Sequence, residues 1–400
     1  MALGAFHRQA PDNLGAAPQD ARPAVRVLLV SPLPPPRGGT GTWTELLLAA
    51  AGARPGIDVE VVDTSPRWRA EHDLALWKRL VGGGLQGLRD LARTVTLLAT
   101  RRPDVLHLCS VGQLAVMRDA AICAAAWMTG TPLVYHLHFG RIPGIAARST
   151  CEWAVMSRVI RQSACTVVLD ERTRLAVENH LPTSHVRLVP NCFDPAEFVR
   201  HANVAPAARE LPRVLYLGWV LPTKGMAELF VAATRVWCHV RFELRIVGPV
   251  ADEYREELLG SLSPANRSQV HFTGPVARCQ ALDELAAADL LALPSHTEGF
   301  PNVVLEALAL GKPVVATEVG AIPQMLAGVD GPCGLCVPPR DEEAFARALR
   351  TLLTDPAMRR LMGESGRITA LERYTVAAVF RSIEEMWRAA ADGRLESISA

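Results

Sequence analysis

The 400-residue sequence has almost no net charge, no long apolar run and no clear metal-binding motif. Its formal net charge is +1. Proteins that bind nucleic acid in bulk usually present a strongly basic face or domain, so we expect no nucleic acid among the partners. The longest apolar stretch, near residues 120–134, is interrupted by Thr129-Gly130-Thr131-Pro132 and is too short to span a bilayer. The sequence therefore predicts a protein that is soluble or peripheral to a membrane.

Motifs for metals and disulfides are also missing. No Asp-x-Asp occurs and the carboxylates form no compact cluster along the sequence, so no Mg²⁺ or Mn²⁺ site is predicted. The nine cysteines are odd in number and widely scattered, which predicts free thiols in a reducing compartment. Cys333-Gly334-Leu335-Cys336 has the spacing of a redox or half-zinc motif but lacks a second pair. We expect a cytoplasmic protein, either free or bound at the inner face of the membrane.

Length and the repeated order of elements predict two domains. Four hundred residues exceed the size at which a single hydrophobic core keeps growing. Residues 25–30 form an unbroken apolar run, followed by a Pro/Gly loop and an apolar-patterned helix over 42–51. Residues 213–217 open a second unit of the same kind, with a helix over 226–236. Each half of the chain thus begins with a strand, a loop and a helix.

Strands continue to alternate with helices after both opening units, which predicts an α/β protein with two doubly wound parallel sheets. Further strands are expected at residues 59–62, 105–108, 133–136 and 166–169, then at 243–247, 270–272, 290–293 and 314–316. Residues 1–23 contain no continuous apolar region and are expected to be a flexible tail rather than a signal peptide. The other predicted parts are a first domain (24–200), a linker (201–211), a second domain (212–376) and a C-terminal helix (377–400).

The segment 295–313 carries two glutamates eight positions apart. We expect Glu298 on a Gly/Pro turn after a buried strand, and Glu306 inside a helix that opens near Asn302 and closes at Gly311. An ionised carboxylate among apolar residues is costly unless something pairs with it, and a ligand rich in hydroxyls would serve. A helix N-terminus at such a turn also attracts phosphate. Phosphate and polyol together indicate a nucleotide sugar, whereas the plainer alternative is two solvated carboxylates.

The run from Ala288 to Pro323 resembles the donor-site signature of the retaining nucleotide-sugar glycosyltransferases of family 4. In that family the first glutamate lies beside the donor sugar and the second binds the ribose, which implies these roles for Glu298 and Glu306. The resemblance also implies the GT-B fold, in which two Rossmann-like domains face each other across a cleft and a C-terminal helix crosses back to the first domain. The donor-binding stretch would include Gly299, Phe300, Pro301, Asn302 and Val303.

Two features of the first half are candidates for the opposite wall of the cleft. Gly38, Gly39 and Thr40 precede a helix and would allow close approach to a phosphate, unless they form an ordinary turn. No Gly-x-Gly-x-x-Gly follows the first strand, so no nicotinamide cofactor is expected. The family commonly has a histidine near the anomeric centre after this domain's strand at 133–136, which implies a catalytic role for His138. The alternatives are a structural histidine, or half of a metal site with His136.

Lys224 precedes a glycine and a helix start, where a cation would neutralise a diphosphate leaving group. Many relatives place an arginine directly after the glycine that ends the preceding strand, whereas this chain has Trp219 after Gly218. Either another residue supplies this charge, the donor phosphates rely more on the helix ahead of Glu306, or the leaving group is less stabilised. Because no metal site is predicted, Lys224 and backbone amides are expected to meet the leaving-group charge. The resemblance implies metal-independent transfer, with retention, from a nucleotide diphosphate sugar to a hydroxyl acceptor, and no cofactor.

The acceptor is the least defined partner, and a glycan and a lipid-linked molecule both remain open. An amphipathic pattern, interrupted by Gly82-Gly83-Gly84, is formed by Leu74, Trp77, Val81, Leu85, Leu88, Leu91, Val95 and Leu98, with Lys78, Arg79, Arg89 and Arg93. It predicts either two helices that cover the first sheet or a basic surface that docks on a membrane beside the acceptor. A nucleotide-sugar epimerase, a glycan phosphorylase and a catalytically silent binding protein of the same fold are the alternative functions.

Overall fold

The structure is a computed structural model that describes residues 24–35, 38–65, 76–202 and 209–395, with side chains in the helix at 76–101 described from residue 82 onward. The predicted tail (1–23), Leu74 and part of the predicted linker lie outside these residues. So do the side chains of Trp77, Lys78, Arg79 and Val81.

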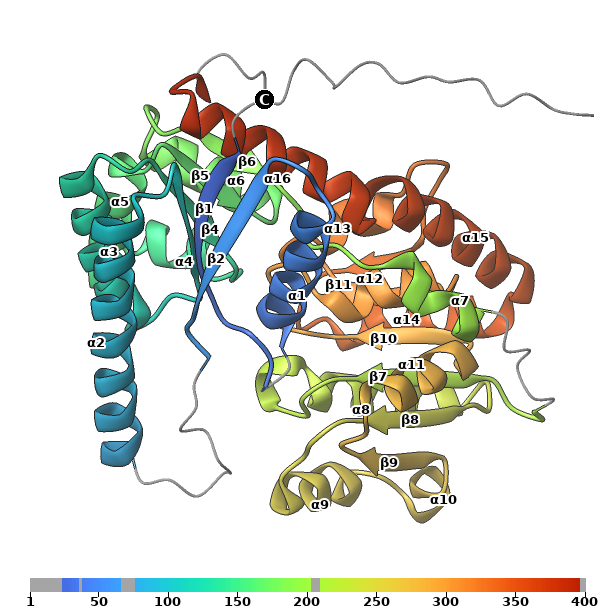
Figure 1. The fold of residues 1–400 in the computed structure, drawn as a ribbon. Helices are drawn as coiled ribbons and strands as arrows, with labels where there is room; N and C mark the ends of the chain where they lie inside the picture. The colour runs from blue at the N-terminus through green and yellow to red at the C-terminus, as the bar shows by residue number, and fades with distance from the viewer. Residues whose placement is uncertain (1–23, 36–37, 66–75, 203–208, 396–400) are drawn as a thin grey trace, which may run out of the picture.

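The first half of the chain forms a six-stranded parallel sheet in the order β2-β1-β3-β4-β5-β6, with helices on both faces (Figure 1). Its elements are β1 (Val25–Ser31), α1 (Gly39–Gly52), β2 (Ile57–Asp63), α2 (Leu76–Arg101), β3 (Val105–Ser110), α3 (Ala115–Thr129), β4 (Leu133–Leu137), α4 (Ile142–Ala147), α5 (Cys151–Gln162), β5 (Cys165–Val168), α6 (Glu171–His180), β6 (Val186–Leu188) and α7 (Pro195–Ala202).

The second half repeats this plan with a parallel sheet in the order β12-β11-β10-β7-β8-β9. Its elements are β7 (Arg213–Leu217), the 3-10 helix η1 (Pro222–Lys224), α8 (Met226–Trp237), β8 (Glu243–Val247), α9 (Asp252–Gly260), α10 (Pro264–Arg267), β9 (Val270–Gly274), α11 (Arg278–Ala287), β10 (Leu290–Leu293), α12 (Asn302–Ala309), β11 (Val314–Thr317), α13 (Ile322–Ala327), β12 (Gly334–Val337), α14 (Glu342–Thr354), α15 (Pro356–Arg373) and α16 (Val376–Ala391).

These sheets confirm the predicted pair of doubly wound parallel sheets. The central strands β3, β4, β10 and β11 are buried along their whole length, because helices cover both faces of a parallel sheet. Continuous apolar runs therefore located these strands in the sequence. The short edge strands β6 and β12 were missed. Cys336 lies on β12, Cys333 is buried just before it, and all nine cysteines are free thiols.

Helix α2 differs from the expectation of two helices broken at Gly82-Gly83-Gly84. That prediction is wrong, because α2 is one continuous helix of 26 residues. Glycine inside a helix costs roughly 1 kcal/mol relative to alanine. The cost is offset by packing in the second half of α2, where Asp90, Thr94 and Leu98 recur at every fourth position and are buried. Tertiary contacts thus extend the helix through a segment of low helix propensity.

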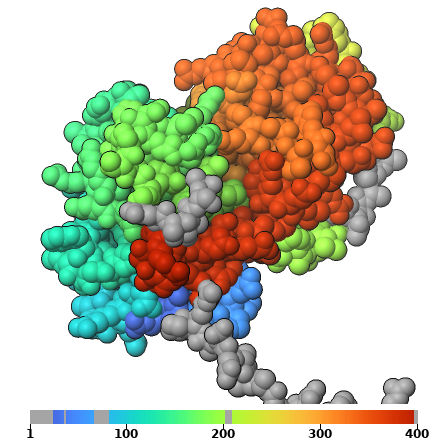
Figure 2. All heavy atoms as spheres, turned by 90° about the horizontal axis from the view of Figure 1, so that it is seen from above, coloured from blue at the N-terminus to red at the C-terminus, as the bar shows by residue number. Residues whose placement is uncertain are grey.

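The chain crosses between the domains twice, and the two crossings lie side by side. The Phe193 backbone N–H donates to the Tyr374 carbonyl (2.9 Å), and the Val376 N–H donates back to the Phe193 carbonyl (2.8 Å). After this second crossing, α16 runs onto the first domain, as the red segment in Figures 1 and 2 shows. There Ile383 and Trp387 are fully buried in one cluster with Leu29 of β1.

Replacing Ile383 by alanine tests this packing. We expect Ile383→Ala to lower the free energy of unfolding of the first domain by about 2–5 kcal/mol, the usual range for a buried large-to-small substitution. The matched control is Ile368→Ala on α15, because Ile368 is 39% exposed. Urea unfolding followed by circular dichroism measures both. Equal midpoints for the two variants would contradict the docking of α16 on the first domain.

Candidate active site

Glu298 lies on the turn between β10 and α12 and is held by two neighbours. The Lys224 Nζ, at the end of η1, lies 2.7 Å from Glu298 Oε1, and the Ser295 Oγ donates to the same oxygen at 2.6 Å. Only 13% of the Glu298 side chain and 29% of the Lys224 side chain are exposed. The structure therefore brings these two predicted residues together at the carboxyl ends of β7 and β10, the edge where parallel sheets bind ligands.

The first domain touches this turn through backbone. A Cβ built on Gly140 would lie 1.6 Å from the Glu298 carbonyl oxygen, and one built on Gly299 would lie 3.2 Å from the Gly140 nitrogen. Gly320, with a φ of +55°, packs against the same turn from the other side. The loop that follows β4 and the turn that carries Glu298 are therefore in direct contact across the two domains.

His138 stands at the start of this loop, immediately after β4. It is half-buried, and both of its ring nitrogens are buried without a hydrogen-bond partner among the described residues. Burial, with a smaller contribution from His107, lowers the pKa of His138 to about 3. The imidazole is therefore neutral near pH 7, so it is suited to hydrogen bonding rather than to carrying a positive charge. His136, two residues earlier, is fully buried.

Glu306 has a protein partner that the sequence did not reveal. The Arg278 Nη1 at the start of α11 lies 2.7 Å from Glu306 Oε1, and the Arg278 Nε lies 2.6 Å from Glu197 Oε1 on α7. Burial raises the pKa of Glu306, and Arg278 opposes that shift. Sequence reasoning missed Arg278, although its place just after β9 puts it at the same sheet edge as Glu298. Glu197 and Arg278 line a cavity of about 550 Å³ between α7 and α11, and Glu306 pairs with Arg278 beside it.

The glycine loop of the first domain meets the N-terminus of α12. Helix α1 begins at Gly39 rather than at Thr42, with Gly38 as its N-cap and Thr40 in its first turn. A Cβ on Gly39 would lie 3.5 Å from the Asn302 side-chain nitrogen. The Asn302 side-chain oxygen in turn accepts from Asn191 of the first domain at 2.8 Å. Gly38, Gly39 and Asn302 thus line one junction between the domains.

The remaining residues of the predicted donor stretch differ in what they expose. Phe300 is 7% exposed and packs edge-on against Tyr374 at 5.4 Å, so its ring belongs to the core. Pro301 is buried and caps α12 without a side-chain hydrogen bond, whereas Val303 is half-buried in the first turn. Pro301 has no N–H to donate, so what this stretch offers a ligand is mainly the backbone N–H groups of its other residues, including Gly299 and Val303.

Trp219 occupies the position where an arginine was expected. Its side chain is 51% exposed, and its carbonyl accepts a hydrogen bond from the Tyr216 hydroxyl at 2.7 Å. Lys224 is therefore the cation that the structure places beside Glu298 at this end of β7. The residues between Gly218 and Lys224 include no arginine.

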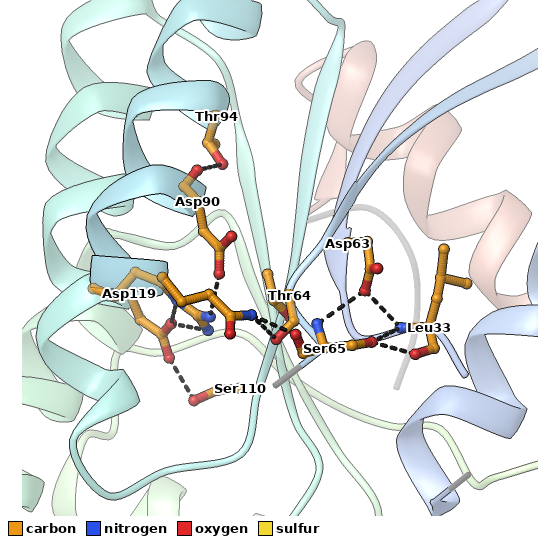
Figure 3. Close-up of polar contacts among 10 residues, drawn as sticks. Leu33, Asp63, Thr64, Ser65, Asp90, Thr94, Ser110 and Asp119 are labelled. Carbon is orange, nitrogen blue, oxygen red and sulfur yellow. Dashed lines mark hydrogen bonds and ion pairs between the residues drawn. The ribbon is translucent and has the colours of Figure 1, made fainter. Parts of the chain in front are cut away.

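A buried polar network supports the first-domain wall (Figure 3). The Asp119 carboxylate is fully buried, accepts from the Ser110 hydroxyl at the end of β3 (2.5 Å) and pairs with Arg118 (2.9 Å). Arg118 also lies 3.8 Å from Asp90 of α2. Burial raises the pKa of Asp119, while Arg118 and the hydroxyl donors oppose that shift. No motif in the sequence indicates this network, because its members come from three different elements, α2, β3 and α3.

The same network reaches the loop after β1. The Leu33 backbone N–H donates to Asp63 Oδ1 (3.1 Å) and to the Ser65 Oγ (2.8 Å), as Figure 3 shows. The ends of β1, β2 and β3 are therefore tied together at the edge of the sheet that faces the second domain. Such ties hold the loops of this wall in place.

Among the described residues, one group has the composition and spacing of a metal site. His107, Cys109 and His136 have ligand-type atoms within 4.8 Å of one another, and all three are buried. His138 is not part of this group, so the pair of His136 and His138 considered from the sequence is not the one that the structure assembles. His107 and Cys109 belong to β3 and His136 belongs to β4, so the group is not part of the turn that carries Glu298.

Comparisons with known families cover both domains. Residues 38–192 match the family described as glycosyl transferase 4-like domain, and residues 211–355 match glycosyl transferases group 1. The chain is 32% identical over 278 residues to D-inositol 3-phosphate glycosyltransferase of Kineococcus radiotolerans, a match that covers 59% of this chain and 62% of that protein. It is 27% identical to the enzyme of the same name from Segniliparus rotundus, over 96% of this chain and 90% of that protein.

Solved structures share the fold. Sucrose-phosphate synthase from Thermosynechococcus elongatus superposes with a TM-score of 0.71 at 20% identity, covering 92% of this chain and 100% of that one. Anabaena HepE, solved in complex with UDP and glucose, has a TM-score of 0.66 at 19% identity, covering 91% and 100%. These likenesses confirm the predicted GT-B architecture.

The ion pair of Arg278 and Glu306 makes a prediction about pH. A buried carboxyl with a raised pKa binds protons more readily folded than unfolded, so its contribution to stability falls as pH rises toward the folded pKa. This loss of stability is larger without Arg278. We therefore expect Arg278→Ala to lower the free energy of unfolding by about 2–4 kcal/mol at pH 8 and by clearly less at pH 5. Urea unfolding at the two pH values measures the difference.

Two controls accompany this measurement. Adding Glu306→Gln to Arg278→Ala removes the unpaired carboxylate and should restore most of the stability at pH 8. Arg255→Ala on α9 breaks exposed pairs with Asp252 and Glu256 and should cost about 1 kcal/mol or less. An Arg278→Ala loss that is equal at both pH values would show that Glu306 does not depend on Arg278 for its charge.

Proposed function

The chain belongs to the group 1 glycosyl transferases, with a glycosyl transferase 4-like first domain, and we propose that it moves a glycosyl group from a nucleotide diphosphate sugar to a hydroxyl acceptor in polysaccharide or glycolipid biosynthesis. The printed names of its relatives are those of glycosyltransferases, and Anabaena HepE was solved with UDP and glucose. The chain spans 62% of the Kineococcus radiotolerans enzyme and 57% of D-inositol 3-phosphate glycosyltransferase of Streptomyces avermitilis, less than two thirds of either relative.

One observation carries the proposal. His138, Lys224 and Glu298 come from three separate loops. Lys224 pairs with Glu298, and the turn that carries Glu298 contacts Gly140, two residues after His138. A cation, a carboxylate and a neutral imidazole at one interdomain contact suit the three parts of a nucleotide sugar donor. In this proposal Lys224 neutralises the diphosphate, Glu298 positions the donor sugar, and His138 hydrogen-bonds that sugar near its anomeric carbon.

The nucleotide would extend along α12 toward Glu306. The first-turn N–H groups of α12, near Asn302 and Val303, would bind donor phosphate together with Gly38, Gly39 and Thr40 from the first domain. Glu306 would accept from the ribose hydroxyls, sharing its charge with Arg278, which lies 2.7 Å away. Donor phosphate would compete with Glu298 for Lys224, so binding would loosen the ion pair between them.

We further propose that transfer proceeds with retention and without a metal. Leaving-group charge would be met by Lys224 and the backbone amides, and the acceptor hydroxyl would attack from the same face, assisted by the leaving phosphate. Glu298 is assigned to positioning and charge stabilisation rather than to nucleophilic attack. Its carboxylate is already engaged by Lys224 and Ser295, which leaves it poorly placed to form a bond to carbon.

Replacing Glu298 tests this assignment. We expect Glu298→Gln to lower transfer about a hundredfold or more, the usual effect of losing one preorganised electrostatic group. The exposed Glu253→Gln on α9 should match wild type. Release of nucleoside diphosphate from a panel of UDP-, GDP- and ADP-sugars, with and without acceptor sugars, measures the rate.

The same assay separates the alternatives. Donor turnover should persist in excess EDTA, and NMR of the product should show the anomeric configuration of the donor. A product that is an isomerised nucleotide sugar would identify an epimerase, and binding without turnover would identify a silent protein. Full activity of Glu298→Gln would remove the site assignment.

For the acceptor side we propose docking on an anionic membrane surface. The middle of α2 exposes Leu85 and Leu88, each 65% exposed, beside the exposed Arg89 and Arg93. An apolar stripe flanked by cations is typical of helices that lie in a bilayer interface. No helix within the described ranges has both the length and the apolar character needed to cross a bilayer. Such docking would bring a lipid-linked acceptor to the first-domain wall of the cleft.

Charge reversal on α2 tests the docking. Each cation near an anionic surface contributes about 1 kcal/mol, so Arg89→Glu with Arg93→Glu should weaken binding to vesicles containing phosphatidylserine about thirtyfold or more. Arg347→Glu with Arg350→Glu on α14 makes the same charge change at exposed positions of the second domain and should leave binding nearly unchanged. Co-sedimentation measures the bound fraction. Equal binding by both double variants, or none by wild type, would exclude this surface.

A further inference from the structure

A chain of rings links the C-terminal helix to His138. The Trp387 Nε1–H on α16 donates to His107 Nδ1 at 2.9 Å, and His107 Nε2 lies 3.2 Å from His136 Nδ1. The rings of His136 and His138 lie against each other with centroids 3.9 Å apart. Trp43 of α1 packs edge-on against both of these rings. Nothing in the proposed donor contacts uses Trp387, His107 or His136.

Trp387 determines which nitrogen carries the proton in two of these rings. An indole N–H only donates, so His107 Nδ1 accepts and is unprotonated. Burial lowers the pKa of His107 to about 3, so the ring is neutral and its one proton sits on Nε2. That N–H donates to His136 Nδ1. Burial also lowers the pKa of His136 well below its usual range, which leaves its proton on Nε2.

This order of protons disfavours a metal at His107, Cys109 and His136. A histidine ligates a metal through a nitrogen with a free lone pair, and a cysteine ligates as thiolate. Trp387 engages Nδ1 of His107 and thereby places the proton on Nε2, so neither nitrogen is free. Burial raises the pKa of the Cys109 thiol to about 12, which keeps it protonated. The hydrogen-bonded chain is therefore the arrangement that these groups favour.

We infer that Trp387 is a positioning residue for His138. Its indole N–H fixes the tautomers of His107 and His136, and the ring of His136, held in one orientation, supports the ring of His138 at the cleft. The inference rests on the proposed function in that His138 contacts the donor sugar.

His138 depends on this support because none of the described residues gives it a polar anchor. Both of its ring nitrogens are buried without a partner among the described residues, as is Nε2 of His136. Its orientation therefore comes from packing against His136 and Trp43. If the indole donor is removed, His107 Nδ1 is left buried without a donor, which favours ring rotation or the other tautomer. His136 then loses its single hydrogen-bonding arrangement, and His138 loses a fixed surface to pack on.

NMR of the full chain with ¹⁵N-labelled histidine tests the tautomers directly. Long-range ¹H–¹⁵N spectra should show His107 and His136 of the wild type as Nε2–H forms, with signals assigned through His107→Gln and His136→Gln. Trp387→Phe keeps a large ring and removes the donor, so an Nδ1–H form of His107 should appear. An Nδ1–H form of His107 in the wild type would overturn the inference, whatever Trp387→Phe shows.

Kinetics test the consequence for the site. Trp387→Phe should lower kcat about tenfold while the KM for the donor stays within about twofold, because ring orientation changes and the phosphate contacts do not. Phe380→Leu on the same helix is the matched control, since Phe380 is buried and packs on Trp387 with centroids 6.0 Å apart. It should retain kcat within about twofold of wild type.

The outcomes separate cleanly. An equal loss of kcat in Phe380→Leu and Trp387→Phe would assign the effect to packing and overturn the inference. Shifted tautomers with unchanged kcat in Trp387→Phe would overturn it as well. Full activity of His138→Ala would instead overturn the proposed contact between His138 and the donor, while the tautomers measured by NMR would still stand.

Discussion

The contact between Gly140 and the turn at Glu298 is the constraint on which the rest of the site depends. A single Cβ at residue 140 would lie 1.6 Å from the Glu298 carbonyl oxygen, so the two backbones meet with no space between them. This contact sets His138 opposite Glu298 and, through Glu298, opposite Lys224. Because His138 belongs to one domain and the other two residues belong to the second, the proposed site is complete only while the domains touch at this point.

Buried charge is the second organising theme. Glu306 is 12% exposed and would be costly alone, yet it pairs with Arg278, which also holds Glu197 on the helix that leaves the first domain. Asp119 likewise pairs with Arg118 and accepts hydrogen bonds from the hydroxyls of Ser110 and Tyr135. Each carboxylate thus ties together elements that are distant in sequence. Both ties lie near the contact between the domains, where they hold the polar groups of the proposed donor site in place.

Much of the fold could be predicted from the sequence because parallel strands buried on both faces are continuous apolar runs. Glu298 and His138 could be nominated because each follows the carboxyl end of such a strand. Glu306 was nominated as a carboxylate inside an apolar helix, and Lys224 by its place before a glycine and a helix start. What could not be predicted depends on distant partners. The pairing of Glu306 with Arg278 joins residues 28 positions apart, and Trp387 bonds to His107 across 280 positions. The continuity of α2 through three glycines likewise depends on packing, since local propensity argues against it.

The return of α16 to the first domain also bears on how the chain is made. The sheet of that domain is finished at residue 188, yet Ile383 and Trp387 fill part of its core and Trp387 supplies a hydrogen bond inside it. During synthesis, this apolar surface of the first domain stays uncovered until α16 has left the ribosome. The last strand of the second domain, β12, ends at residue 337, so that sheet is made before α16. The two domains are therefore translated in one order and completed in the other.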